Sequence, residues 1–196
     1  MITGIILASG FSKRMERGKL LLDVGGIPLI ERVIKAAKFS LLDDIILVYQ
    51  SDRVRDIGEK YRVRTVCNNS AHEGQSAAVK LGIKESRPDT DAFMFLLGDQ
   101  PFLDPTTINI LIEQFMRNQH QIIVPVYNGK RGNPVIFPTL FRDELLAIEG
   151  DRGGKVIVKK MEDRTRFVPI EKSAPGIDID TQEEYERIQQ LMPGQE

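Results

Sequence analysis

Short apolar runs alternate with amphipathic helical patterns through the first two thirds of this chain. Four runs are apolar at successive positions, which is typical of strands buried on both faces: residues 5–7, 45–48, 93–97 and 122–124. Between them, apolar side chains recur at helical spacing. One such face comprises Leu29, Ile30, Val33, Ile34 and Ala37, and another comprises Ile108, Leu111, Ile112, Phe115 and Met116. This order predicts an α/β fold, a mostly parallel sheet with helices on both faces, whose ligands bind beyond the carboxyl ends of the strands.

Length, charge and cysteine content narrow the class of protein. The 196 residues fit a single domain, 1–196, because no repeat, low-complexity tract or linker divides them. A net charge of −1 provides no global positive field, so we expect neither nucleic acid nor a membrane surface as a partner. The single cysteine, Cys67, cannot form an internal disulfide, and the apolar N-terminal run is too short for a signal sequence. We therefore expect a cytoplasmic protein.

The loop after the first predicted strand is rich in small and basic residues. It reads LASGFSKRM from Leu7 onward, and Lys19 follows shortly after. Small residues let backbone amides approach an anion, and Ser12, Arg14 and Lys19 add donors and charge, so the loop predicts phosphate binding. It matches neither GxxxxGK[ST], because Leu20 follows Lys19, nor GxGxxG. A glycine turn with solvated basic side chains is the alternative.

A carboxylate follows the most hydrophobic run. Asp99 lies in the sequence GDQP, just after the strand predicted over residues 93–97. A carboxylate in this place is costly to desolvate unless it faces a cation or a hydrogen-bond donor. The sequence therefore predicts either a metal ligand or an Asx turn in which Asp99 bonds nearby backbone amides.

A second acidic corner lies near the C-terminus. Alternation over residues 176–180 predicts a strand with Asp178 and Asp180 on one face. Thr181 and Glu184 have the spacing of a capping box for a final helix. Since Asp180 adjoins the start of that helix, Asp178 is the better candidate for a metal ligand.

Polar loops interrupt the middle and the second half of the chain. Gln75 and Ser76 precede a helix of small residues. One prediction is that both side chains hydrogen-bond the edge of a nucleobase. The alternative is that Ser76 only caps the helix. His72 and His120 have polar neighbours, and we assign both to the solvated surface. Residues 128–134 and 150–154 interrupt β-like and helical patterns. We expect this second half to form a lobe that completes a pocket.

Six segments occur in a fixed order: LASGFSKRM with Lys19, EGQSAAVKLG, GDQPF, RGNPVIF, GDRGGK and DIDTQEEY. Together they resemble the molybdenum cofactor nucleotidyltransferases over essentially the whole chain, and most of all the cytidylyltransferases, whose first loop reads LAAG rather than the LAGG of the guanylyltransferases. Ser9 stands where the cytidylyl pattern has alanine, and Asn133 where many members have histidine. The resemblance implies a Rossmann-like nucleotidyltransferase fold that joins CMP from CTP to the phosphate of molybdenum-molybdopterin, uses Mg2+ and releases pyrophosphate.

The resemblance also implies a set of site residues. The expected catalytic residues are Arg14, Lys19 and Asp99. The expected metal ligands are Asp99 with Asp178 or Asp180. The expected nucleotide-binding residues are Leu7, Ala8, Ser9, Gly10, Ser12, Arg14, Lys19, Gly74, Gln75, Ser76 and Asp99. The acceptor is expected to contact Arg131, Asn133, Gly153 and Gly154, which otherwise form an exposed hairpin and a helix break.

Other functions fit the same residues. One alternative keeps the fold and changes the substrates, either to GTP with the same cofactor or to a nucleotide joined to a sugar or polyol phosphate. A different class of function is a carrier that shelters the molybdenum cofactor without catalysis. A molybdoenzyme that receives the product and docks transiently is the expected protein partner.

Overall fold

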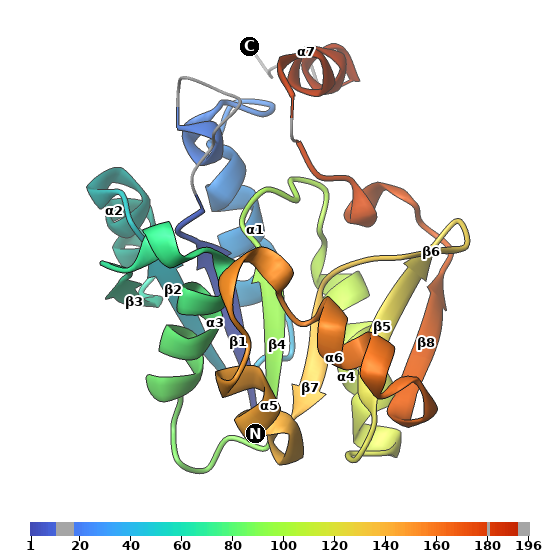
Figure 1. The fold of residues 1–196 in the computed structure, drawn as a ribbon. Helices are drawn as coiled ribbons and strands as arrows, with labels where there is room; N and C mark the ends of the chain where they lie inside the picture. The colour runs from blue at the N-terminus through green and yellow to red at the C-terminus, as the bar shows by residue number, and fades with distance from the viewer. Residues whose placement is uncertain (11–17, 180, 192–196) are drawn as a thin grey trace.

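The computed structural model describes residues 1–10, 18–179 and 181–191. Within them, one mixed sheet of eight strands runs in the order β3-β2-β1-β4-β7-β5-β6, and β8 pairs with β5 (Figure 1). The strands are β1 (Ile2–Ala8), β2 (Asp44–Tyr49), β3 (Arg64–Cys67), β4 (Ala92–Leu97), β5 (Ile122–Tyr127), β6 (Lys130–Arg131), β7 (Val135–Pro138) and β8 (Thr165–Ile170). Strands β1 to β4 pair in parallel, as do β5 and β8, whereas β7 lies antiparallel between β4 and β5. The predicted α/β fold with a mostly parallel sheet is confirmed.

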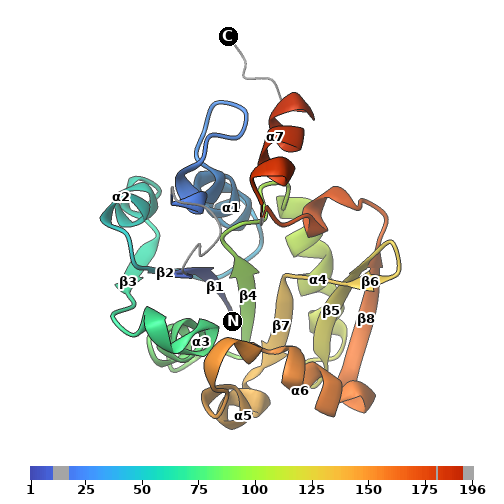
Figure 2. The ribbon, with the colours of Figure 1, turned by 45° about the horizontal axis from the view of Figure 1, so that its top comes forward.

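The helices cover both faces of this sheet (Figure 2). The layer on one face contains α1 (Leu29–Lys38), α2 (Asp52–Lys60) and α4 (Pro105–Arg117), and the layer on the other contains α3 (Gln75–Lys84), α5 (Arg142–Leu146) and α6 (Lys155–Lys160). Helix α7 (Gln182–Leu191) lies beyond the carboxyl ends of the strands (Figure 1). The short 3-10 turns are η1 (Lys19–Leu21), η2 (Ala71–Glu73), η3 (Thr139–Phe141), η4 (Gly150–Arg152), η5 (Glu162–Arg164) and η6 (Ala174–Gly176).

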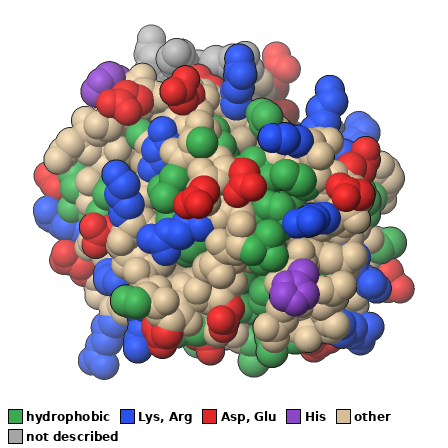
Figure 3. Space-filling view, turned by 60° about the horizontal axis from the view of Figure 1, so that its bottom comes forward, with side chains coloured by type: hydrophobic (Ala, Val, Ile, Leu, Met, Phe, Trp, Pro, Cys, Tyr) green, Lys and Arg blue, Asp and Glu red, His purple; other side chains and the backbone are tan. Residues whose placement is uncertain are grey.

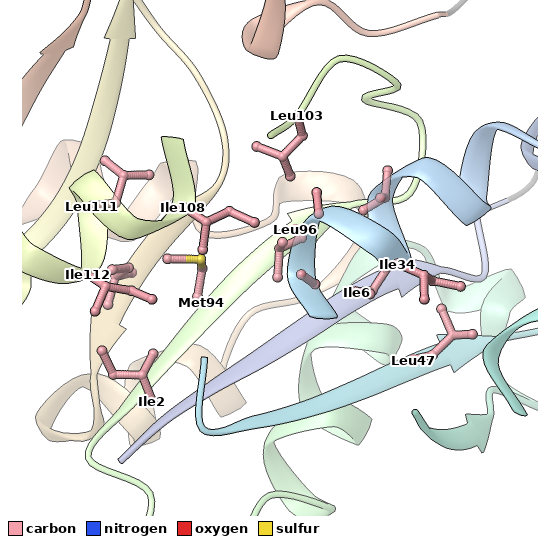
Figure 4. Close-up of a cluster of buried hydrophobic side chains, with 14 of the residues drawn as sticks. Ile2, Ile6, Ile34, Leu47, Met94, Leu96, Leu103, Ile108, Leu111 and Ile112 are labelled. Atoms are coloured by element: carbon pink, nitrogen blue, oxygen red, sulfur yellow. The ribbon is translucent and has the colours of Figure 1, made fainter. Parts of the chain in front are cut away.

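The apolar runs are buried on both faces because successive strand residues point into different layers. Along β4, Met94 and Leu96 pack in the α1–α4 layer, whereas Phe93 and Phe95 pack in the α3–α6 layer. Figure 4 shows the first of these clusters, in which Met94 and Leu96 lie beside Ile108 of α4. The same alternation operates along β1 and β2 and explains why the sequence lacks a polar face in these strands.

The helical faces agree with their predicted patterns except at one residue. All five predicted residues of α1 are fully buried: Leu29, Ile30, Val33, Ile34 and Ala37. In α4, the predicted stripe is buried through Phe115, but the prediction for Met116 was wrong, since this side chain is 57% exposed. Met116 follows Phe115 directly, so it lies about 100° around the helix axis, at the edge of the stripe.

Helix α4 begins with Asp104 and Pro105, two residue types that favour the start of a helix. Asp104 is its N-cap and accepts a hydrogen bond from the Thr107 amide at 2.7 Å, and Pro105 occupies the first turn, where no amide donor is needed. Burial alone would raise the pKa of Asp104, but the hydrogen bonds from Thr107 and the interaction with Lys172 outweigh burial and lower it.

Replacement of Asp104 by alanine is expected to cost about 1 kcal/mol of stability, because the helix loses its cap. The melting temperature should fall by about 2–4 °C near pH 7, measured by thermal unfolding. The pKa of Asp104 is lower in the folded protein than in the unfolded chain. The stabilisation that Asp104 provides is therefore present above the ordinary carboxyl pKa and is lost as the pH falls below about 4. The exposed Asp89→Ala is the control, and equal melting temperatures for the two variants at pH 7 would contradict the capping role.

The C-terminal segment confirms one prediction and corrects another. The capping box is present, because the Thr181 amide donates to Glu184 and the Glu184 amide donates to the Thr181 hydroxyl. The strand predicted over residues 176–180 was wrong: Asp178 and Ile179 lie outside any strand, and Asp180 lies outside the described residues. The Ile179 side chain instead packs with Tyr185 of α7, and its amide donates to the Asp99 carbonyl at 3.2 Å.

The surface carries charges of both signs. Figure 3 shows acidic and basic side chains interspersed over the face that it displays, with a few hydrophobic ones between them. Among the described residues, no helix is long and apolar enough to cross a membrane. His72 and His120 are both exposed, which confirms their assignment to the surface.

Candidate nucleotide and acceptor site

The centre of the candidate site lies where β1 and β4 end side by side. These strands are parallel neighbours, so the loops that follow them meet at the same edge of the sheet, and the Gly98 amide donates to the Leu7 carbonyl at 3.1 Å. Lys19, in η1, reaches this edge and donates from Nζ to Asp99 Oδ2 at 2.8 Å. The side chains of Lys19 and Asp99 are only 10% and 25% exposed. The structure thus brings together two residues that lie 80 positions apart.

One oxygen of the Asp99 carboxylate has no hydrogen-bond partner among the described residues. Asp99 Oδ1 is buried and has no hydrogen-bond partner among residues 1–10, 18–179 and 181–191. The alternative prediction of an Asx turn, in which Asp99 would bond nearby backbone amides, is therefore wrong among the described residues. Leaving such an oxygen unpaired costs about 1–3 kcal/mol, and hard divalent cations prefer carboxylate oxygens, so the residue fits a metal ligand. The described residues contain no group of three His, Cys, Asp or Glu side chains that could hold a metal ion.

A buried glutamine connects Asp178 to the Asp99 loop. Gln100 Nε2 donates to Asp178 Oδ1 at 2.7 Å, and the backbone bond from Ile179 to Asp99 holds the two segments together. Our sequence reasoning missed Gln100, although its place beside Asp99 in GDQP was a signal. Asp178 therefore lies next to the loop that carries Asp99, whereas Asp180 lies outside the described residues.

The Ser9 hydroxyl is held inside the protein. Ser9 Oγ accepts a hydrogen bond from Asn68 Nδ2 at 2.8 Å, and both side chains are buried. Asn68 Oδ1 accepts in turn from the Ser70 amide at 3.1 Å. The loop after β3 is thereby fixed to the loop after β1. Sequence reasoning missed Asn68, whose only signal was its place directly after a strand.

The EGQS segment, residues 73–76, is in close contact with the GDRGG segment, residues 150–154. The Gln75 amide, the first of α3, donates to Asp151 Oδ1 at 3.2 Å. Gly74 is the N-cap of α3, and the cap residue provides no side-chain hydrogen bond. The alternative prediction that Ser76 caps this helix was therefore wrong. The Ser76 side chain is instead buried in the first turn of the helix. A Cβ on Gly153 would lie 2.6 Å from Gln75 Oε1. Asp151, which sequence reasoning missed, therefore joins the two halves of the chain.

A cavity of about 610 Å3 opens between the sheet and the α3–α6 layer. All four predicted acceptor residues line it, together with Leu7, Gln75 and Asp178. Its apolar wall consists of Val79, Phe95, Leu97, Val124, Val135, Phe137 and Val158. The remaining lining residues are Gly132, Lys155, Lys159 and Glu162. The expectation that the second half of the chain completes a pocket is confirmed.

Tyr127 supports the wall of this cavity from behind. Its hydroxyl donates to the Asn133 carbonyl at 2.8 Å, and its ring packs against the backbone of Gly132 and Gly176. Burial, with smaller contributions from Asp104 and Asp178, raises the pKa of Tyr127, so the hydroxyl stays protonated and can donate. Sequence reasoning also missed this residue, which carries no motif.

Arg131 is already engaged by neighbouring side chains. Its guanidinium forms an ion pair with Glu162 and lies 4.3 Å from the centre of the Phe167 ring. Among the other predicted residues, Ala8 is buried and Gly10 is exposed at the end of β1. Ser12 and Arg14 lie outside the described residues.

Comparisons with known proteins identify the family of this chain. The model of the MobA-like NTP transferase domain matches residues 4–165. The chain is 27% identical to the purine catabolism protein PucB of Bacillus subtilis over 97% of both chains, and 28% identical to a probable molybdenum cofactor guanylyltransferase of Thermococcus kodakarensis over 96% of this chain and 94% of that one. It resembles in fold the manganese complex of Rv0371c from Mycobacterium tuberculosis, with a TM-score of 0.80 and 23% identity over 95% of this chain and 97% of the other. The chain therefore belongs to the family of MobA-like NTP transferase domains and is a nucleotidyltransferase.

Proposed function

We propose that this enzyme transfers CMP from CTP to the phosphate of molybdenum-molybdopterin and releases pyrophosphate. The observation that carries the proposal is the Asp99 carboxylate, which is bound to Lys19 through one oxygen and whose other, buried oxygen has no hydrogen-bond partner among the described residues. The loop that carries Asp99 is bonded to Asp178, which lines a cavity with an apolar wall. We also propose that residues 1–196 form a single domain and that a molybdoenzyme receives the product.

The chemistry needs no nucleophile from the protein. An oxygen of the acceptor phosphate attacks the α-phosphorus of CTP, and the bond between this phosphorus and the oxygen that bridges to the β-phosphate breaks. The obstacle is repulsion, because each pair of unit charges 4 Å apart costs about 4 kcal/mol at an effective dielectric of 20. The site must therefore supply positive charge and alignment.

Charge compensation is divided between side chains and a cation. Asp99 and Asp178 would hold Mg2+, with Asp180, two residues after Asp178, as a further candidate ligand. The cation would supply positive charge against the α-phosphate and the incoming phosphate. Lys19, held by Asp99, and Arg14 neutralise the β- and γ-phosphates and the departing pyrophosphate. The manganese complex of the structural relative supports a divalent cation.

The packing of Ser9 supports a pyrimidine base. Its side chain is buried and bonded to Asn68, so it fills space that a glycine in the LAGG pattern would leave open. A cytosine is smaller than a guanine and needs less room. Gly74, Gln75 and Ser76 complete the proposed base-binding segment at the start of α3.

The cavity supports a flat acceptor. Its apolar wall suits a ring system, and Arg131, Asn133, Gly153 and Gly154 surround it with polar groups and backbone. Sugar and polyol phosphates offer little apolar surface to such a wall. The relative from Thermococcus kodakarensis is named a probable molybdenum cofactor guanylyltransferase, which also supports a molybdenum cofactor as acceptor.

Two assays test the proposed function. Thermal unfolding with CTP, GTP, ATP and UTP, each with and without Mg2+, should show a magnesium-dependent rise of about 5–10 °C for CTP at 100 times its dissociation constant. Pyrophosphate release should then require CTP and molybdenum-molybdopterin together. A shift and turnover with GTP alone would establish guanylyl transfer, turnover with sugar phosphates would change the acceptor, and cofactor binding without pyrophosphate release would indicate a carrier.

Replacement of Ser9 by glycine is expected to reduce the preference for CTP over GTP at least about tenfold, because it opens room for the larger base. The measurement is the ratio of kcat/KM for the two nucleotides. Ser9→Ala is the matched control, since it keeps Cβ and restores the residue of the cytidylyl pattern, and it should retain the preference. An unchanged ratio in the glycine variant would show that Ser9 does not select the base.

A further inference from the structure

Two lysines on one wall of the cavity are not explained by the roles assigned so far. Lys155 and Lys159, on α6, both line the cavity and are exposed. Their separation of four residues places them on the same side of the helix, with Cβ atoms about 5–6 Å apart. Arg131, which lines the same cavity, forms an ion pair with Glu162, whereas neither lysine forms an ion pair with any described residue.

Stability does not account for this pair. Like charges four residues apart on a helix repel and cost a few tenths of a kcal/mol. Lys155 is also the first residue of α6, where the partial positive charge of the helix end opposes a cation. The pair therefore concentrates positive charge on the cavity wall at a small cost in stability.

The surroundings define the ligand further. Gly154, just before Lys155, lies so close to Phe137 that an added Cβ would be 2.7 Å from the ring, so the start of α6 packs directly on the apolar wall. Val158 lies between them in sequence and lines the same wall. An anionic group on an apolar body would satisfy the lysines and the wall together.

The helix that carries the lysines lies on a face of the sheet rather than at its carboxyl edge. Asp99 follows the carboxyl end of β4, whereas α6 packs in front of the sheet over β7 and β5 (Figures 1 and 2). We propose that Lys155 and Lys159 bind a second anionic group of the acceptor, carried on an apolar body, in addition to the phosphate that attacks CTP. This inference rests on the proposed function for the reacting phosphate.

A binding experiment tests the pair without catalysis. The probe is 1-naphthyl phosphate, compared with uncharged 1-naphthol by titration calorimetry in the absence of nucleotide and divalent cation. The wild type should bind the phosphate at least about tenfold more tightly than the alcohol, as expected for one retained charge interaction of about 1.4 kcal/mol. Lys155→Gln/Lys159→Gln should bind both compounds equally.

Lys160→Gln is the matched control, because Lys160 is exposed on the same helix but lines a different cavity. It should keep the wild-type preference for the phosphate. A double variant that retains this preference, or a wild type that shows none, would overturn the inference.

Kinetics separate this inference from the proposed function. The double variant should raise KM for molybdenum-molybdopterin at least about tenfold and leave KM for CTP and the magnesium-dependent thermal shift unchanged. An unchanged acceptor KM in an active enzyme would overturn the lysine inference alone. If the wild type transfers no CMP, the proposed function fails, and the naphthyl phosphate comparison still decides whether the lysines bind an anion.

Discussion

Replacement of Asp99 by asparagine is expected to lower turnover at least about 100-fold while the protein remains folded. The amide has nearly the same shape as the carboxylate and keeps an oxygen for Lys19, but it lacks the negative charge that a divalent cation requires. Pyrophosphate release at saturating CTP, acceptor and Mg2+ measures the effect, and circular dichroism checks the fold.

Asp89→Asn is the matched control for this variant. Asp89 precedes the same strand at its opposite end, is exposed, and forms an ion pair with Arg87 at the surface. It loses the same charge and should keep wild-type turnover. Full activity of Asp99→Asn with Mg2+ would remove Asp99 from the proposed metal site, whereas equal losses in both variants would point to net charge instead.

Replacement of Gly74 by alanine is expected to lower the melting temperature by at least about 4 °C, which corresponds to about 2 kcal/mol at this chain length. Gly74 has φ +92° and ψ −171°, a region that is essentially restricted to glycine. An added Cβ would also lie 2.7 Å from the Gly150 carbonyl carbon and 2.5 Å from Asp151 Oδ1. Relief of this contact must separate the EGQS and GDRGG segments, so CTP binding should weaken as well.

Gly129→Ala separates backbone strain from the contact. Gly129 has φ +76°, but a Cβ there would meet no atom of the described residues within 4 Å. This variant should lose stability through strain alone and keep CTP binding. Thermal unfolding and nucleotide titration of the two variants measure the difference, and identical behaviour would show that the loop contact has no effect of its own.

The sequence predicts strands β1, β2, β4 and β5 well because each of these buried strands is encoded locally. Runs such as residues 93–97 specify a strand that faces two layers without reference to the rest of the chain. The strand predicted over residues 176–180 failed because alternation is weak evidence when the segment is held by other contacts. There, Gln100 binds Asp178, and the Ile179 amide bonds to the Asp99 carbonyl.

The candidate site is harder to predict because its supporting bonds are long-range. Asn68 to Ser9 spans 59 residues, Gln75 to Asp151 spans 76, and Gln100 to Asp178 spans 78. The sequence motifs identified one partner of each bond, namely Ser9, Gln75 and Asp178, but not the residue at the other end. Neutral amides such as those of Asn68 and Gln100 have no pattern of their own, and only the folded chain shows what they hold.

The antiparallel insertion of β7 sets the order in which the sheet can be completed. Strand β4, with the sequence AFMFLL, is paired by β1 on one edge, and among the described residues its other edge is paired by β7 alone, whose last residue is 138. A nascent chain that has emerged only as far as α4 therefore exposes an apolar, unpaired strand edge, the kind of surface that recruits other chains. Synthesis through β7 thus protects the preceding strands from aggregation before the chain meets a substrate.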